Sequence, residues 1–470
     1  MINATSDARR RAVRRTVRTA GAAFAAAAIG LGGAALWRAA AAGPPSAAAQ
    51  NMAAVGLAAG GPPALAALPA NAAVPTSAGL AARLDQILLA KPAGTQIGAA
   101  VTDVATGQLI YGQDQGQAMP PASTIKIATA AAALERMPGT TRFATTVLLD
   151  PGAARIVLVG GGDVTLSSNG ASPDRDFRPA SLQTLVDQTA AALKAAGRTS
   201  VTLGYDDSAF AAPSRAATWS ASYTDGDIAP VHALEVDEGR TEPMYTYSKR
   251  AADPALAAAQ MFAQRLAAAG ITVTGAVTET AAPAKATRLA QVQSPTLNEL
   301  IEHMLTVSDD DLAEALGHLT ARAAGQPATF DGAAASTTAE LQRLGVNANA
   351  VTLYDNSGLS HQDRISPAAL ASLLARIAGA GHPELKEIVV GLPIAGFTGT
   401  LGSRFTGPAS AGVGMVRAKT GTLTGVNSEA GLVEDADGRL LAFSVMASDT
   451  VGAQDQLDQF AAALVGCGCR

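Results

Sequence analysis

Cysteine and histidine are scarce in this sequence, and their scarcity excludes several kinds of chemistry. The only two cysteines, Cys467 and Cys469, lie in the C-terminal tail. We therefore expect the fold to rest on its apolar core, with an oxidised tail pair that is unimportant to activity. The five histidines are widely separated, and no H-E-x-x-H motif or Cys/His cluster occurs. The sequence thus predicts no metal site and no cofactor.

An excess of basic residues is also absent. The chain has 34 Lys and Arg against 39 Asp and Glu, a formal net charge of -5, and so lacks the positive footprint of a nucleic-acid-binding protein. Apolar residues, in contrast, make up 48% of the 470 positions. A chain of this length and composition buries a sizeable core, and we expect two or more domains.

The N-terminal segment predicts export. Six arginines between positions 9 and 18 precede an uncharged apolar run from Thr19 to Leu36, a pattern typical of a signal peptide or a single membrane anchor. We assign residues 1–38 to this segment and favour the retained anchor, although small-residue sites that a signal peptidase could cleave also occur. Residues 39–79 are rich in Ala, Gly and Pro and contain no aromatic residue. They predict a flexible linker between the membrane and the folded part.

An alanine-rich segment after Pro120 and Pro121 predicts a buried helix, yet its first turn carries Ser123 and Lys126. The prolines favour a helix start, and residues three apart project from one side of a helix, so the amine can reach the hydroxyl. Burial and a second nearby cation would keep the amine uncharged and able to act as a base. Alone the motif is weak, because an N-cap serine followed by a lysine extended over an apolar surface has the same spacing.

Further motifs downstream strengthen the catalytic interpretation. Ser308-Asp309-Asp310 precedes a predicted helix, and Lys419-Thr420-Gly421-Thr422 ends a predicted strand. The order S-x-x-K, S-D-N and K-T-G is the motif set of class A β-lactamases and penicillin-binding proteins. Four other segments are L-V-G-G-G-D-V-T-L (158–166), D-D-S-A-F (206–210), D-N-S-G-L-S (355–360) and L-P-I-A-G-F-T-G-T-L (392–401).

With these segments, the sequence from about residue 80 to the C-terminus resembles the class C low-molecular-mass penicillin-binding proteins, which are D-alanyl-D-alanine carboxypeptidases that also act as endopeptidases. The resemblance implies peptidoglycan peptides as substrates and β-lactams as inhibitors. The resemblance implies that Ser123 is the acylated nucleophile, Lys126 its base and Ser308 a proton relay. It also implies that the K-T-G segment, Lys419 with Thr420, Gly421 and Thr422, binds the substrate carboxylate. The N–H groups of Ser123 and Thr422 would form the oxyanion hole.

Two positions depart from the family pattern. Asp310 stands where the family has Asn and would contact the substrate; an ionised acid cannot donate the hydrogen bond of an amide, and it favours the charged form of a nearby lysine. His361 stands where the family has an Arg expected to bind a carboxylate on the peptide side chain. Activity could therefore be reduced, and recognition of diaminopimelate is in doubt.

The motif positions and predicted elements imply an α+β fold: a penicillin-recognising, serine transpeptidase-like domain with an antiparallel sheet flanked by helices, and an inserted α/β-type domain. We assign residues 80–142 and 289–470 to the catalytic domain and 143–288 to the insert. The expected strands are 97–104, 109–111, 143–149, 154–159, 201–204, 271–277, 413–419, 425–433 and 440–446, and the expected helices lie within 80–89, 181–196, 255–269, 296–344, 366–390 and the C-terminal segment.

The glycine run 160–162 follows one of these strands but has neither the P-loop nor the dinucleotide-binding spacing. It predicts a close-packed turn, with Asp163 shaping the rim of the cleft.

Three functions stay open at this point. The first is a carboxypeptidase or endopeptidase that trims peptidoglycan stem peptides outside the membrane. The second is a β-lactamase, which shares the motifs but is normally one compact domain without such an insert. The third is a cell-wall-binding protein whose chemistry Asp310 has weakened.

Overall fold

The computed structural model describes residues 72–91, 94–150 and 152–470. The predicted signal or anchor (1–38) lies outside these residues, as do residues 39–71 of the predicted linker (39–79). The predicted linker extends too far, because residues 77–79 belong to the first described helix. Among the helices of the described ranges, none has both the length and the apolar character needed to cross a bilayer.

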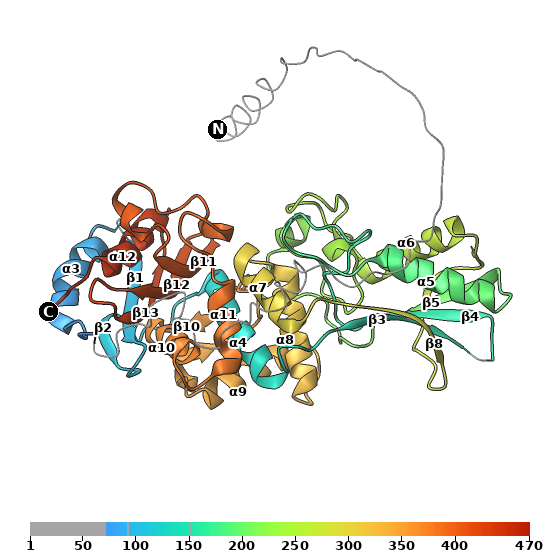
Figure 1. The fold of residues 1–470 in the computed structure, drawn as a ribbon, viewed down its shortest axis with the longest axis horizontal. Coiled ribbons are helices and arrows are strands. Elements are labelled where there is room, and N and C mark those ends of the chain that lie inside the picture. The colour runs from blue at the N-terminus through green and yellow to red at the C-terminus, as the bar shows by residue number, and fades with distance from the viewer. Residues whose placement is uncertain (1–71, 92–93, 151) are drawn as a thin grey trace, which may run out of the picture. The chain divides into compact units, whose positions relative to one another are not determined.

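An antiparallel sheet forms the centre of the catalytic domain and joins the two ends of the described chain (Figure 1). Its order is β11-β12-β13-β1-β2, so the last strands of the chain lie beside the first. The strands are β1 (Gln96–Asp103), β2 (Leu109–Gln113), β11 (Val416–Leu423), β12 (Val426–Glu434) and β13 (Leu440–Ser448). This confirms the predicted strands, except that the strand predicted over 413–419 begins at Val416 and extends through the K-T-G motif to Leu423.

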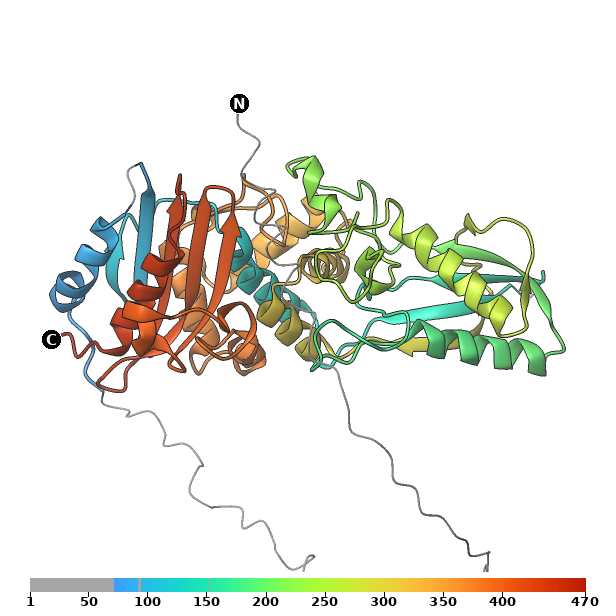
Figure 2. The same cartoon turned by 90° about the horizontal axis from the view of Figure 1, so that it is seen from above.

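Helices cover both faces of this sheet (Figure 2). α3 (Ser77–Leu89) and α12 (Gln454–Val465) share an apolar cluster with Phe443 on one face, and α10 (Pro367–Ala378) shares another with Met446 on the opposite face. The alternation along β13 follows from the two-residue period of a strand. The predicted α+β class is therefore confirmed.

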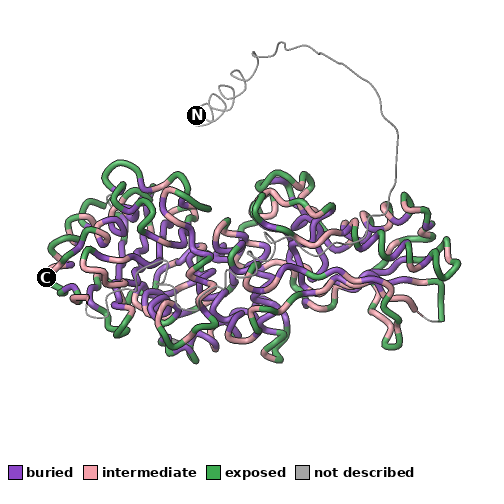
Figure 3. Tube along the Cα trace, viewed as in Figure 1, coloured by how far each residue is buried: buried purple, intermediate pink, exposed green. Residues whose placement is uncertain are grey.

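A group of helices lies beside the sheet on the α10 side and carries two of the three motifs. Its members are α4 (Lys126–Arg136), α7 (Leu297–Val307), α8 (Asp310–Ala323), α9 (Phe330–Arg343) and α11 (Lys386–Gly391), with the short strands β9 (Val351–Thr352) and β10 (Arg364–Ile365) nearby. α4 is buried from Lys126 to Leu134, as Figure 3 shows for this part of the chain. Its small alanine side chains let α8 and α9 pack closely against it.

The insert has its own sheet and its own apolar core. The sheet order is β6-β5-β4-β3-β8, with β7 paired to β5; β4 and β5 are parallel, whereas β3 is antiparallel to both its neighbours. Its elements are β3 (Ala144–Leu149), β4 (Arg155–Val159), α5 (Leu182–Ala195), β5 (Ser200–Asp206), α6 (Pro254–Ala268), β6 (Thr272–Val273), β7 (Thr278–Glu279) and β8 (Thr287–Gln293).

Two details of the insert differ from the expectation. The boundary placed at residue 288 falls inside β8, whose pairing with β3 assigns it to the insert sheet. The predicted strand 271–277 is shortened to β6, because Gly275 has a φ of +77°, outside the range of a strand; β7 begins after the predicted strand.

The turn at residues 160–162 is close-packed, as predicted. A Cβ on Gly160 or Gly161 would overlap the backbone carbonyl of Ala233 or Ala144, respectively. Asp163 after it is only 2% exposed and accepts hydrogen bonds from Thr165. The expectation that Asp163 shapes the cleft rim is therefore wrong.

Short 3-10 helices complete the chain: η1 (Ala122–Ile125), η2 (Ala221–Asp225), η3 (Asp237–Gly239), η4 (Ala348–Ala350), η5 (Pro383–Leu385), η6 (Gly399–Leu401) and η7 (Gly407–Gly412). In the tail, Cys467 and Cys469 form a disulfide, and Cys467 is buried in the α3–α12 cluster. The N–H of Thr76 donates to the carbonyl of Cys469 at 2.7 Å. The tail is thereby attached to the start of α3.

Candidate active site

Ser123 lies on a turn that neighbouring segments hold closely. The preceding Ala122 has a left-handed φ of +46°, a conformation that non-glycine residues rarely adopt. Two glycines allow close approach on either side: a Cβ on Gly421 would lie 2.7 Å from the carbonyl of Pro121, and one on Gly358 would overlap the carbonyl of Ala122. The K-T-G strand and the D-N-S-G-L-S loop are therefore both in contact with the turn that carries Ser123.

Lys126 is fully buried at the start of α4 and donates to three oxygens. Its Nζ lies 3.0 Å from the Oγ of Ser123, 2.5 Å from Oδ1 of Asp310 and 2.6 Å from the carbonyl of Ser357. The first contact puts the amine where it can take a proton from the serine hydroxyl. The second is an ion pair, which favours the charged form of the amine and so opposes that transfer.

Ser308 occupies the bend between α7 and α8. Its φ of 65° and ψ of 43° end α7 in the left-handed conformation, and Asp309 then begins α8 as its N-cap, accepting from the N–H of Leu312 at 2.9 Å. The Nζ of Lys419 lies 2.8 Å from the Oγ of Ser308 and 2.8 Å from the carbonyl of Thr420. The second and third motifs are thus joined by a direct hydrogen bond.

The two lysines share one nearby carboxylate, Asp310. Burial, followed by the positive charge of Lys126, lowers the pKa of Lys419 well below its ordinary value, and Asp310 opposes that shift. Burial raises the pKa of Asp310, while Lys126 works in the opposite direction. Lys419 and Asp310 thus have perturbed pKa values, as groups that gain and lose protons in a reaction often do.

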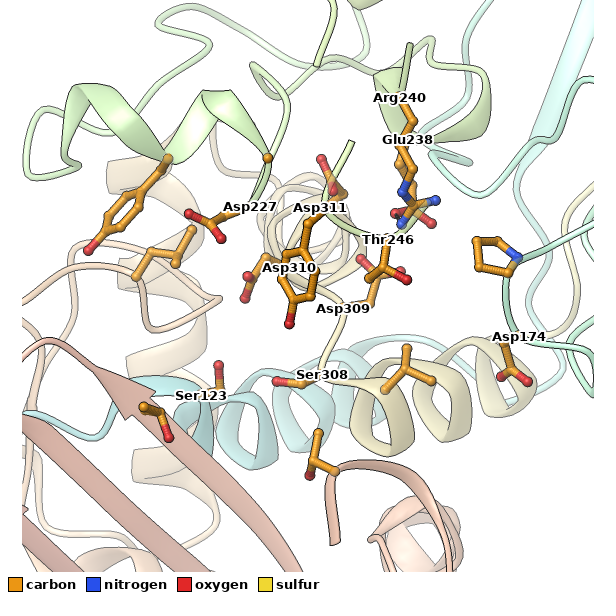
Figure 4. Close-up of a pocket in the computed structure, with 18 of the residues that line it drawn as sticks. Ser123, Asp174, Asp227, Glu238, Arg240, Thr246, Ser308, Asp309, Asp310 and Asp311 are labelled. Carbon is orange, nitrogen blue, oxygen red and sulfur yellow. Dashed lines mark hydrogen bonds and ion pairs between the residues drawn. The ribbon is translucent and has the colours of Figure 1, made fainter. Parts of the chain in front are cut away.

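These groups border a cavity of about 750 Å³ between the catalytic domain and the insert. Figure 4 shows Ser123 and Ser308 on one side of it and Asp227, Glu238 and Arg240 on the other. The candidate site residues that line the cavity are Ser123, Ser308, Asp310, Thr420 and Thr422.

The remaining candidates lie behind the lining or outside it. Lys126 and Lys419 are buried behind the wall of the cavity, and Gly421 lies in β11 against Pro121. His361 is exposed, outside the set that lines the cavity. Its predicted role in binding the substrate stays a prediction.

Two segments that matched the family without an assigned role contribute directly to the site. The D-N-S-G-L-S loop supplies the carbonyl of Ser357 to Lys126, and Thr400 of the F-T-G-T segment lies with its Oγ1 2.8 Å from that of Thr420. The loop is held by Glu314 of α8, which accepts from the N–H of Asn356 at 2.9 Å and of Ser357 at 2.7 Å. Burial, with the nearby charge of Asp355, raises the pKa of Glu314 to about 8.

An ionic network on the opposite side attaches the insert to α8. Arg250 of the insert lies 3.1 Å from Oδ2 of Asp311, and Oδ1 of Asp311 accepts from the N–H of Ala229 at 2.7 Å. Burial and the negative charge of Asp311 raise the pKa of Glu235 well above its ordinary value. Sequence analysis missed this network, because none of its residues belongs to a motif.

A serine hydroxyl next to a buried lysine, with a second serine–lysine pair beside it, is the arrangement that a serine enzyme with an amine base requires. Comparison with known proteins identifies the family. Residues 80–251 and 244–465 match the D-Ala-D-Ala carboxypeptidase 3 (S13) family, and the chain belongs to it.

Similar proteins span most of the chain. Carboxypeptidase DacB of Mycolicibacterium smegmatis is 36% identical over 408 residues, 85% of this chain and 86% of the relative. The D-alanyl-D-alanine carboxypeptidase of an Actinomadura species is 29% identical and covers 75% of this chain and 78% of its own length. The crystal structure of penicillin-binding protein 4 from Haemophilus influenzae shares the fold, with a TM-score of 0.68 at 22% identity over 81% of this chain and 98% of that one.

Proposed function

We propose that this protein is a serine D-alanyl-D-alanine carboxypeptidase that acts on peptidoglycan stem peptides through an acyl-enzyme at Ser123. The observation that carries the proposal is the 3.0 Å contact between the Lys126 amine and the Ser123 hydroxyl, beside the Lys419–Ser308 pair. Family membership and the names of the relatives support the same activity. Because its substrate lies outside the cytoplasm, we propose extracytoplasmic action, with residues 1–38 as signal or anchor.

Acylation begins at the carbonyl of the penultimate D-alanine. The Oγ of Ser123 attacks this carbon while its proton passes to the Nζ of Lys126. The tetrahedral oxyanion accepts from the backbone N–H groups of Ser123 and Thr422; the contact between β11 and the Ser123 turn supports this role. The terminal carboxylate of the substrate lies against Thr420 and Thr422, both of which line the cavity.

The leaving D-alanine needs a proton on its amine. Ser308 supplies it, and the proton that Lys126 took from Ser123 replaces the one that Ser308 gave, so the Lys126 amine is neutral again before water attacks. The amide bond breaks, terminal D-alanine departs, and an ester links Ser123 to the rest of the peptide. Water then attacks the ester, its proton returns through Lys126, and the free serine is restored. A β-lactam copies the amide and its carboxylate, so it acylates Ser123 by the same route and leaves slowly.

The runner-up function is a cell-wall-binding protein with weak chemistry. The 2.5 Å ion pair between Lys126 and Asp310 favours it, because this carboxylate engages the amine that would take the Ser123 proton. A β-lactamase is less well supported, since the cavity is partly formed by an insert that compact β-lactamases do not have.

Labelling with a fluorescent penicillin tests the acyl-enzyme. The unaltered protein is expected to label, and Ser123→Ala is expected to lose labelling by more than about a thousandfold. Ser410→Ala, an exposed serine far along the chain, is the matched control and should label normally. Rapid loss of the label would indicate a β-lactamase.

Defined muropeptides distinguish the remaining possibilities. Mass spectrometry of the products should show loss of one D-alanine from pentapeptide stems. Cleavage across a crosslink would indicate an endopeptidase. Absence of both products, together with absence of labelling, would favour the binding protein.

A further inference from the structure

A second group of polar side chains lies in the cavity beyond Ser308. Glu238 of η3, His303 of α7 and Asp309 of the α7–α8 bend each offer one ligand atom, and these atoms all lie within 4.8 Å of one another. All three residues are buried and line the cavity. Imidazole and carboxylate groups are the ligands that first-row divalent cations bind.

His303 has one nitrogen held and the other available. Its Nδ1 lies 3.0 Å from Oδ2 of Asp174, and its ring stacks on Phe177 with centroids 3.9 Å apart and planes 11° apart. Its Nε2 lies 3.7 Å from Oδ2 of Asp309, beyond hydrogen-bonding distance, and forms no hydrogen bond within the described part of the chain. A carboxylate that fixes one ring nitrogen while the other faces a shared point is the arrangement of metal-binding histidines.

In Asp309 and in Glu238, one carboxylate oxygen already has a partner within the protein. Oδ1 of Asp309 accepts from the N–H of Leu312, so Oδ2 faces His303. Oε2 of Glu238 contacts Arg240. Coordination by the other carboxylate oxygen is compatible with that guanidinium contact. The three ligands therefore need little reorganisation to bind a cation.

The surrounding charge also favours a cation. Arg250 lies closer to Asp311, at 3.1 Å, than to Glu238, at 3.8 Å. The two guanidinium groups nearest to Glu238, those of Arg240 and Arg250, are shared among the carboxylates of Glu235, Glu238, Asp309 and Asp311. A divalent ion would offset the remaining negative charge.

We propose that Glu238, His303 and Asp309 bind a first-row divalent cation, with Zn²⁺ as the best match and water from the cavity completing a tetrahedral site. A ligand set that includes imidazole excludes Mg²⁺ and Ca²⁺ as preferred ions, because these take oxygen ligands. The site joins the insert, through Glu238, to the segment that carries Ser308. It does not depend on the proposed peptidase function.

This proposal reverses the expectation from the sequence, which predicted no metal site. The three ligands are separated along the chain and come from three elements, so no local spacing signals them. Only the contact between insert and catalytic domain brings Glu238 to the other two.

Zinc binding by the full chain in detergent tests the proposal. After equilibration with Zn²⁺ and removal of free metal, we expect about one zinc per chain by elemental mass spectrometry and a rise in melting temperature with added zinc. His303→Phe keeps a ring against Phe177 but removes both nitrogens, and it should lose the zinc and the temperature shift. X-ray absorption should show nitrogen and oxygen ligands and no sulfur.

Matched controls address the other groups that could hold zinc. Glu135, His382 and Glu384 form a similar triad near the surface, so His382→Asn should retain the zinc. The Cys467→Ser/Cys469→Ser variant should retain it as well. Loss of zinc in either control, no retained zinc in the unaltered chain, or full retention in His303→Phe would overturn the proposal.

A milder variant keeps the test decisive if His303→Phe does not fold. Asp174→Asn leaves the ring nitrogen a hydrogen-bond partner but removes its charge, and it should raise the zinc dissociation constant by about tenfold or more. Circular dichroism checks the fold. An unchanged dissociation constant in folded Asp174→Asn would count against the site.

Discussion

The two sides of the cavity differ in the balance of their buried charges. On the catalytic side, Lys126 and Lys419 are both fully buried and have a single carboxylate, Asp310, between them. On the insert side, carboxylates outnumber cations: Glu235, Glu238 and Asp311 surround Arg250 and Arg240.

This difference in charge balance corresponds to two roles, proton transfer on one side and attachment of the insert to α8 on the other. Burial and the charge of Lys126 lower the pKa of Lys419 well below its ordinary value, so this amine can change its charge during a reaction. A buried guanidinium among carboxylates keeps its charge and holds its partners in place. The lysine side is therefore suited to chemistry, and the arginine side to fixing the insert on α8.

The largest expected effect comes from removing the base. Lys126→Met should reduce acylation by fluorescent penicillin by roughly a thousandfold or more, because it removes the amine that hydrogen-bonds to the Ser123 hydroxyl. The single variant also leaves Asp310 without its partner. Lys126→Met/Asp310→Asn removes both charges, and normal acylation in this folded double variant would disprove the role of Lys126.

Removing a buried cation on the insert side should reduce the stability of the fold. Arg250→Met leaves Asp311 buried without its cation and removes the hydrogen bond to the carbonyl of Glu238. The free energy of unfolding in urea should fall by roughly 3 kcal/mol. Arg470→Met, at an exposed pair with Asp437, should have little effect. Equal losses in the two variants would remove the contrast between buried and exposed pairs.

The loop behind Lys126 should make stability depend on pH. The pKa of Glu314 is raised to about 8 in the fold, so the folded state binds more protons than the unfolded state between about pH 4.5 and 8. Stability should therefore fall as pH rises through this range. Glu314→Gln keeps an acceptor oxygen and stays neutral, and it should flatten the decline.

A urea series at several pH values measures that decline. Glu302→Gln, at an exposed position of α7, should leave the pH dependence unchanged. A decline as steep in Glu314→Gln as in the unaltered protein would show that another group is responsible.

The smallest expected effect comes from removing the charge of Asp310. Asp310→Asn removes the carboxylate 2.5 Å from the Lys126 amine, so the neutral amine becomes easier to form. Acylation near neutral pH should rise by about tenfold, and its pH profile should move to lower pH. Asp227→Asn, an exposed acid of the same cavity, is the control. A rate for Asp310→Asn that is unchanged or lower would show that Asp310 does not hold the base back.

Much of the fold could be predicted from local patterns. The turn and alternating runs predicted β1 and β2, the Pro120-Pro121 pair marked the start of the Ser123 turn, and the amphipathic run before Ser308 predicted α7. These features depend on residues close in sequence. The pairing of β7 with β5 and the placement of β8 in the insert sheet depend on contacts between distant segments, which no local pattern fixes.

The candidate site divides in the same way. Ser123, Ser308 and Lys419 stand in short motifs, so their residue types and order could be identified in advance. Glu314, Arg250 and His303 are ordinary helix or loop residues by local pattern. Their importance follows from what lies next to them in the fold.

The sequence by itself determined the reactive groups: a serine with a lysine one helical turn later, a second serine before a helix, and a K-T-G strand. Short-range geometry is enough for this, since spacing along a helix or strand fixes which side chains project together. The tertiary structure alone decided the electrostatic setting of those groups, including the Lys126–Asp310 pair, the buried Lys419 and the triad at Glu238, His303 and Asp309. Charges act through space on whatever the fold brings near, and contacts between distant segments are set by the packing of the whole domain.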